Sequence, residues 1–165
     1  MKQYLLTALF TAIIISKCLA VDFYVSSTAT GSGDGSFASP WKLQQALNSP
    51  AEITSPTDTV WIWLRAGIYT NSFDAQTSFS CFTNGSANAP IIFRNYENER
   101  ASIDGQLSYT LLCGLGNCSF TWFWGIEVFN SDNSDRDHSN IDRLGNIYCT
   151  AKNMKFINMI VHDIG

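Results

Sequence analysis

Phe123-Trp-Gly-Ile-Glu-Val-Phe-Asn130 is followed, 33 residues further along the chain, by Phe156-Ile-Asn-Met-Ile-Val-His-Asp163. The two stretches place apolar side chains at matching positions, with Phe opposite Phe and Val128 opposite Val161. Both also carry turn-forming residues at their third and eighth positions. A unit that repeats at this period buries its apolar face only by stacking on the next unit. The repeat therefore predicts a solenoid whose strands stack ~4.8 Å apart.

The rest of the chain up to this repeat consists mainly of predicted strands and turns. The strands are expected at Val21–Ser26, Thr59–Leu64, Ile68–Thr70, Thr77–Thr83, Ile91–Tyr96 and Ala101–Gly105. Most of them are rich in β-branched and aromatic residues, which favour strands. One helix of about two turns is predicted, with Ser39 as its N-cap and Pro40 and Trp41 in its first turn. The sequence thus indicates an all-β fold class.

The composition limits the classes of partner. The chain has 165 residues, of which 45% are hydrophobic and 15% charged, and its formal net charge is −4. This apolar content is enough for one globular core. The acidic balance argues against the basic patch that a nucleic-acid partner requires, so none is expected.

The amino terminus is typical of a secretory signal. Lys2 is followed by an apolar run from Tyr4 to Ile15, and Cys18-Leu-Ala20 ends in small residues suited to cleavage after Ala20. The run is shorter than the ~20 residues that span a bilayer. We therefore expect residues 1–20 to be removed, giving a secreted protein with no membrane span. The alternative is an uncleaved membrane anchor.

Export bears on the cysteines. Cys81, Cys113, Cys118 and Cys149 remain after signal removal, and an even number in an oxidising compartment favours two disulfides. Their connectivity stays open among three possibilities. A zinc site is not expected, because the C-x4-C spacing lacks a second cysteine pair or a nearby histidine.

Several stretches together resemble the N-terminal part of secreted right-handed parallel β-helix repeat proteins of the pectate-lyase-like superfamily. These stretches are Phe23–Ser26 with Ser39–Leu47, Asp58–Thr70, Ala87–Tyr96 through Gly105, Gly125–Ser131 and Ile160–Gly165. The resemblance implies a parallel β-helix solenoid. Residues 21–57 would form an opening strand, a loop and a short capping helix, and residues 58–165 would form the first coils.

The same resemblance implies an extracellular polysaccharide as partner, but it does not fix the activity. The superfamily contains polysaccharide lyases, glycoside hydrolases, epimerases and members of unknown role. If the full-length protein is an enzyme, a lyase acting by β-elimination is the favoured interpretation. The alternatives are a non-enzymatic, adhesin-like surface scaffold and part of a glycoside hydrolase.

The carboxyl end carries a further expectation. The sequence stops at Gly165 in mid-pattern, without a polar capping segment. An open solenoid end exposes unpaired backbone and apolar side chains. We therefore expect an amino-terminal fragment, inactive alone, whose open end is covered by missing coils or by a partner chain.

The densest polar cluster is the stretch from Asn130 to His138. Its carboxylates could hold calcium, the one cofactor for which the sequence offers ligands: Asp132, Asp135 and Asp137. Arg136 could neutralise a uronate carboxylate, and His138 could act as the base of a β-elimination. The competing interpretation is a solvated turn between strands. His162 is a further candidate base, with a strand-end histidine as the alternative.

Two tryptophan pairs could contact sugars. Trp61 and Trp63 lie two residues apart and thus share one face of a strand. Because the aliphatic residues between them suit the interior, this pair is predicted to face outward as a substrate-binding surface. Trp122 and Trp124 are predicted to face inward, since strict alternation places Glu127 outside, unless Gly125 breaks the alternation. Burial under a loop is the alternative for both pairs.

Overall fold

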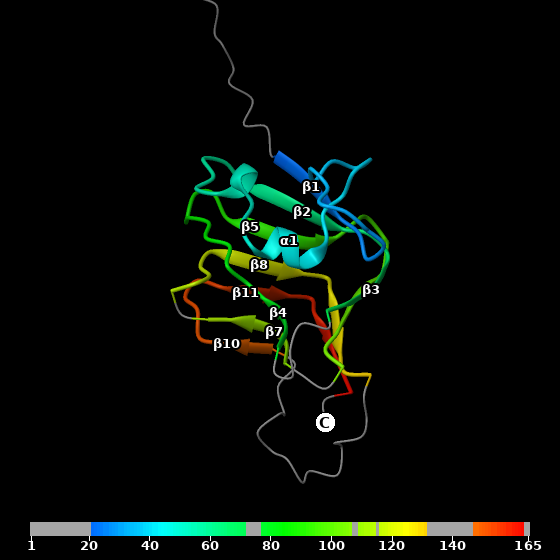
Figure 1. Cartoon of the computed structure of the whole chain (residues 1–165). Helices are drawn as coiled ribbons and strands as arrows, with labels where there is room; N and C mark the ends of the chain where they lie inside the picture. The colour runs from blue at the N-terminus through cyan, green and yellow to red at the C-terminus, as the bar shows by residue number, and fades with distance from the viewer. Residues whose placement is uncertain (1–20, 72–76, 107–108, 115, 132–146, 164–165) are drawn as a thin grey trace, which may run out of the picture.

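The computed structural model describes residues 21–71, 77–106, 109–114, 116–131 and 147–163. Every strand pair in these ranges is parallel, and the strands form three stacks around a shared core (Figure 1). The chain passes through the three sheets in turn and returns one step lower each time. This is a parallel β-helix, which confirms the predicted fold class.

The strands divide among sheets A, B and C. Sheet A contains β1 (Val21–Val25), β2 (Val60–Leu64), β5 (Ile91–Asn95), β8 (Thr121–Trp124) and β11 (Lys155–Ile157). Sheet B contains β3 (Gly67–Thr70), β6 (Ala101–Asp104), β9 (Glu127–Phe129) and β12 (Ile160–Val161). Sheet C contains β4 (Thr77–Ser80), β7 (Tyr109–Cys113) and β10 (Ile147–Cys149).

The repeat of 33 residues sets the register between the last two coils. Phe123 pairs with Phe156 across β8 and β11, and Val128 pairs with Val161 across β9 and β12. Residues that match in the two sequence stretches are therefore neighbours in space. The solenoid predicted from this repeat is confirmed.

The interior consists of columns in which each coil stacks a side chain on the coil before it. In sheet A, the rings of Phe93 and Phe123 stack with centroids 5.2 Å apart, and Phe156 continues the column at 5.8 Å from Phe123. Phe93 and Phe123 are fully buried. Removing such a ring costs about 3–5 kcal/mol in a typical core, so these columns hold the coils together.

The helix starts later than predicted. Lys42 is the N-cap of α1 (Leu43–Leu47), so the expected cap at Ser39 and first turn at Pro40 are wrong. The reason is Trp41, whose backbone stays extended and forms a parallel bridge with Val25. A short 3-10 turn follows at Ala51–Ile53. Within the described ranges, neither helical segment has the length and apolar character needed to cross a bilayer.

Helix α1 covers the upper edge of sheet C. The side-chain amide of Gln44 donates to the carbonyl of Ser80 at 2.8 Å and accepts from its N–H at 3.0 Å. It thereby occupies backbone groups of β4 that a further strand would otherwise use. At the end of the helix, the carbonyl of Leu47 accepts a hydrogen bond from the N–H of Phe82 at 2.8 Å. The helix thus acts as the cap that the sequence predicted.

The corner between sheets A and B depends on left-handed backbone. Gly125 has φ +67°, and Asn158 occupies the equivalent corner of the next coil with φ +48°. A Cβ at Gly125 would lie 2.3 Å from Oδ1 of Asn95. Glycine therefore meets both the backbone and the space requirement here.

We expect Gly125→Ala to destabilise the protein by about 1–3 kcal/mol, because alanine is strained at positive φ and its methyl group would displace Asn95. Urea unfolding monitored by circular dichroism measures the change. Gly31→Ala is the matched control, since nothing lies within 4 Å of a Cβ at that position. Equal stability of the two variants would contradict the role assigned to this corner.

Candidate functional site

Aromatic side chains gather on the outer face of sheet A. Val60, Ile62 and Leu64 point into the core, so Trp61 and Trp63 lie outside, partly buried. This agrees with the outward orientation predicted for the pair. Their rings stack on each other, with centroids 5.4 Å apart and planes at 11°.

The rings extend beyond this pair into a continuous group, which we call the aromatic strip. Its six members, each within 6.5 Å of another between centroids, are Phe37, Tyr24, Tyr96, Trp63, Trp61 and Trp124. They come from β1, β2, β8 and the loops beside them. At the exposed end, the side chain of Phe37 is 52% accessible.

Two arginines lie against the strip. The guanidinium of Arg94 lies 4.2 Å from the ring centre of Trp124, and that of Arg65 lies 4.4 Å from the ring centre of Phe37. Arg65 is paired with Glu99 at 3.1 Å. Among the described residues, by contrast, Arg94 forms no ion pair. The strip therefore combines flat apolar rings with the cation of Arg94 and with the carboxylate of Asp22, which accepts a hydrogen bond from Nε1 of Trp63 at 2.8 Å.

The second tryptophan pair is oriented differently from the expectation. Trp122 and Trp124 were predicted to face inward, but Phe123 between them is fully buried and both indoles lie on the outer side. The left-handed residue Gly125 shifts the alternation by one position, so Glu127 also remains on the outer side of its own strand. Lys155 lies below Trp122, with its ammonium 3.8 Å from the ring centre.

A second polar group lies on the outer face of sheet B, and we call it the Glu127 cluster. Its members are Arg100, Ser102, Glu127, His162 and Asp163. Glu127 is only 4% exposed and accepts hydrogen bonds from Arg100, Ser102 and His162. It does not face solvent as predicted, because Arg100 and His162 cover its carboxylate.

The cluster shifts the protonation of its members. The hydrogen bonds from Arg100 are the largest influence that lowers the pKa of Glu127 to about 2, against the opposing effect of burial. Hydrogen bonds to Glu127, at 2.8 Å, and to Asp163, at 2.7 Å, raise the pKa of His162 above its usual 6.5. The group therefore favours an ionised Glu127 beside a protonated His162.

The contacts of His162 restrict its use as a catalytic base. The two ring nitrogens each contact a carboxylate, so accepting a proton from a substrate requires one of these contacts to break. The ring also stacks on Phe129, at 5.5 Å between centroids, beside a cleft of about 420 Å³. Its contacts with Glu127 and Phe129 connect the end of β12 to β9, so His162 helps to hold two successive coils together.

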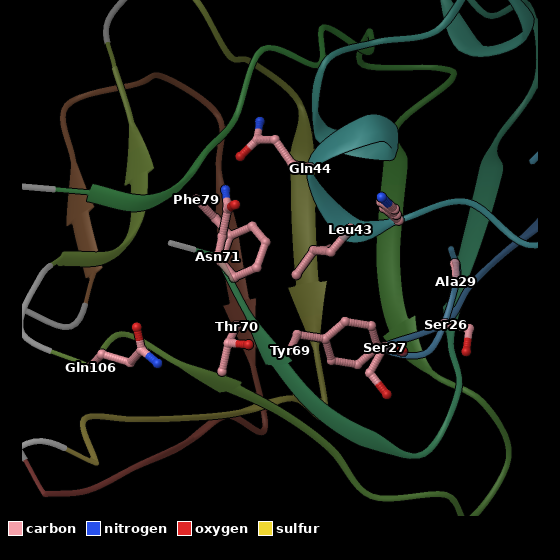
Figure 2. Close-up of a pocket in the computed structure, with 11 residues that line it drawn as sticks. Ser26, Ser27, Ala29, Leu43, Gln44, Tyr69, Thr70, Asn71, Phe79 and Gln106 are labelled. Atoms are coloured by element: carbon pink, nitrogen blue, oxygen red, sulfur yellow. The ribbon is translucent and has the colours of Figure 1, made fainter. Parts of the chain in front are cut away.

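A separate cavity of about 310 Å³ lies between α1 and β3 (Figure 2). Tyr69, Phe79 and Gln44 are among its lining residues, and Lys42 supplies its charged group. The phenol of Tyr69 donates to the carbonyl of Arg65 at 2.7 Å, and Gln44 is bound to β4. The candidate site residues that the structure describes, Trp61, Trp63 and His162, are not among the residues that line this cavity.

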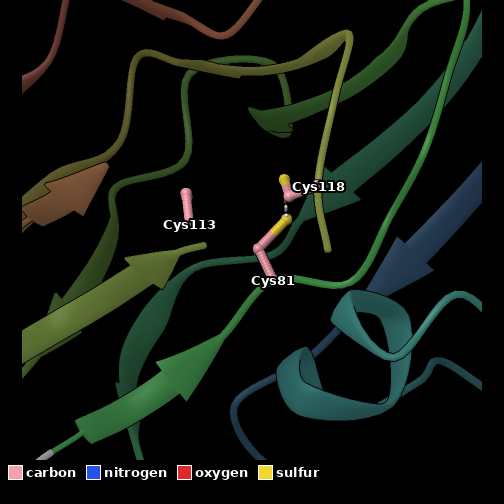
Figure 3. A group of neighbouring side chains, drawn as sticks. All are labelled: Cys81, Cys113 and Cys118. Carbon is pink, nitrogen blue, oxygen red and sulfur yellow. Dashed lines mark hydrogen bonds between the residues drawn. The ribbon is translucent and has the colours of Figure 1, made fainter. Parts of the chain in front are cut away.

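Three of the four cysteines predicted to form disulfides come together in the core. The sulfur atoms of Cys81, Cys113 and Cys118 all lie within 4.8 Å of one another (Figure 3). Cys149, on β10, is exposed.

The remaining candidates lie outside the described residues. They are Asp132, Asp135, Arg136, Asp137 and His138. The calcium site and the base proposed there stay predictions.

One comparison with known proteins found a relative. The chain is 33% identical over 103 residues to pectate lyase PEL9 of Emericella nidulans. The chain is similar to a pectate lyase. The match covers 62% of this chain and 22% of the relative's length. No family model matches the chain, and no solved structure matches it significantly.

Sequence reasoning named His162 but missed Arg100 in the Glu127 cluster, and it missed Arg94 and Lys155 beside the tryptophans. Arg94 lies between Trp63 and Trp124 because these three residues share one register position in neighbouring strands. The repeat of 33 residues could have placed Lys155 below Trp122, since the two residues are 33 positions apart. Arg100, which binds Glu127, lies outside the two stretches of the repeat, so the repeat could not show that the two residues meet.

The Glu127 cluster predicts a pH dependence of folding. Because the pKa of His162 is raised on folding, its contribution to stability is complete below about pH 6.5 and is lost as pH rises through the folded value. Glu127 acts in the opposite direction: its contribution is lost as pH falls from about 4.5 towards 2. Among the residues that the structure describes, the other charges that contact these two groups are Arg100 and Asp163.

We expect His162→Gln to remove part of the loss of stability between pH 6 and 9, because glutamine does not titrate. Urea midpoints measured across this range for the variant and the wild type give the difference. If the two curves of midpoint against pH stay parallel, the ion pairs of His162 do not contribute to stability. That result would contradict the role of His162 in holding the coils together.

Proposed function

We propose that the protein is secreted and binds or processes an extracellular polysaccharide that contains uronic acid units. The relative is a pectate lyase, and pectate is a polymer of such units. In the whole protein, the reaction that this relative supports best is β-elimination. The acidic cluster after Asn130, with Arg136 and His138, supplies the sequence-derived candidates for that chemistry.

The observation that carries the proposal is the aromatic strip with Arg94. A pyranose ring has an apolar face of C–H groups, which packs against indole and phenol rings in the way other apolar surfaces do. A uronate also carries a carboxylate, for which a guanidinium is a strong hydrogen-bonding partner. The strip presents both features side by side, with Arg94 4.2 Å from the ring centre of Trp124.

Charge further favours an acidic ligand at this face. The chain as a whole has a formal net charge of −4, which disfavours polyanions in general. Within the described ranges, however, neither Arg94 nor Lys155 forms an ion pair, and both lie on the outer side of sheet A beside tryptophans. The two cations thus lie beside the tryptophans, on the face where the carboxylate of Asp22 also accepts a hydrogen bond from Trp63.

Double substitution of Trp61 and Trp63 by alanine should weaken binding of polygalacturonate roughly 10-fold, since each ring contact contributes about 0.5–1.5 kcal/mol. Isothermal titration calorimetry of the secreted chain measures the affinity. Arg94→Gln should weaken binding of polygalacturonate but not of a neutral polysaccharide.

The matched control is Phe82→Ala, which removes an aromatic side chain of 42% exposure away from the strip. Thermal unfolding confirms that each variant is folded. If the tryptophan variant binds as tightly as this control, the strip is not the binding surface.

A further inference from the structure

Sheet C carries a column of cysteines. Cys149 on β10 pairs directly with Cys113 on β7. Cys81 follows β4, and its N–H donates to the carbonyl of Leu112 at 2.9 Å, which continues the register of β4 on β7. Cys81, Cys113 and Cys149 thus occupy one position in three successive coils.

Cys118 lies in the turn between β7 and β8, next to a bridge that joins Ser119 to Asn84. It lies in the same coil as Cys113, and its sulfur is 2.7 Å from the sulfur of Cys81 in the coil before (Figure 3). The sulfur of Cys118 also lies within 4.8 Å of that of Cys113, and 3.5 Å from the sulfur of Met154 in the following coil. Cys81 and Cys118 are both buried.

Coil spacing excludes one of the three possible connectivities. A bond between Cys81 and Cys149 would have to cross two coil steps, or roughly 9.6 Å between Cα atoms. A disulfide tolerates at most about 7 Å between Cα atoms. The connectivity that contains this bond, and that would leave Cys113 to pair with Cys118, is therefore not compatible with the stacking.

Sulfur distance and register together favour one of the remaining two connectivities. The sulfur atoms of Cys81, Cys113 and Cys118 lie within 4.8 Å of one another, so either Cys113 or Cys118 is near enough to bond Cys81. If Cys81 joined Cys113, Cys118 would have to join Cys149, whose register neighbour is Cys113, and Cys118 would leave its position 2.7 Å from the sulfur of Cys81. If Cys81 joins Cys118, the remaining pair is Cys113 and Cys149, which are direct lateral neighbours at one coil step. We propose that Cys81–Cys118 and Cys113–Cys149 are the two disulfides of the mature protein.

The two bonds would connect three successive coils. In each bond, two S–H groups lose their protons and two electrons pass to an external disulfide, that of an oxidised thiol–disulfide oxidoreductase or oxidised glutathione. This inference rests on the export part of the proposed function and not on carbohydrate binding. Refolding the reduced chain with glutathione separates the two, because it tests the pairing without export.

Peptide mapping of the unreduced chain tests the proposal directly. Pepsin digestion at acidic pH suppresses disulfide exchange, because exchange requires a thiolate, and Leu115 offers a cleavage site between Cys113 and Cys118. We expect the Cys81 peptide to be linked to the Cys118 peptide, and the Cys113 peptide to the Cys149 peptide. Finding these links after refolding but free thiols in the chain isolated from the cells that make it would support the pairing and contradict export.

A single cysteine substitution gives a second test, which does not require the variant to be as stable as the wild type. In Cys81→Ser, alkylation of the denatured chain should label Cys118 alone, whereas the rival connectivity would label Cys113. Replacing both Cys81 and Cys118 by serine should lower the Tm by roughly 10 °C.

Three results would overturn the proposal. They are a link from Cys81 to Cys113, four free thiols after oxidative refolding, and a bound metal ion in native mass spectra that holds Cys81, Cys113 and Cys118 as thiolates.

Discussion

The structure depends on stacking successive coils in register, so that backbone hydrogen bonds and apolar side chains are shared between neighbours. Each strand of sheet A pairs with strands one coil away, and its inward side chains meet their equivalents, as Phe93, Phe123 and Phe156 do. A single coil could bury little of this surface alone, because its apolar face has no other cover. The end of the stack therefore needs protection, which α1 gives to sheet C through Gln44.

The same register organises the outer surface. Residues far apart in sequence, such as Trp63, Arg94 and Trp124, become neighbours because they occupy one position in successive coils. The outer side of sheet A thus forms an aromatic strip with a positive charge, whereas that of sheet B carries a buried carboxylate between Arg100 and His162. The first surface is the one that we propose binds a sugar polymer, and the second joins coils.

The fold class and the alignment of the last two coils could be predicted from the sequence, because stacked units repeat their apolar pattern. Trp41 shows the limit of local signals: Ser39 and Pro40 are typical of a helix start, but a tertiary bridge to Val25 keeps the chain extended. Gly125 shows another limit, since one left-handed residue reversed the expected orientation of two tryptophans. Contacts such as Arg100 with Glu127 depend on coil lengths that vary, so no motif in one sequence reveals them.

The central claim is parallel, in-register stacking of coils, and backbone nuclear Overhauser effects test it most directly. In a parallel pair, Phe123 and Phe156 should show interstrand contacts between the Hα of one strand and the amide protons of the other, repeated between Phe93 and Phe123. Strong Hα–Hα contacts between these strands would instead indicate antiparallel pairing. That result would contradict the solenoid and with it every surface described above.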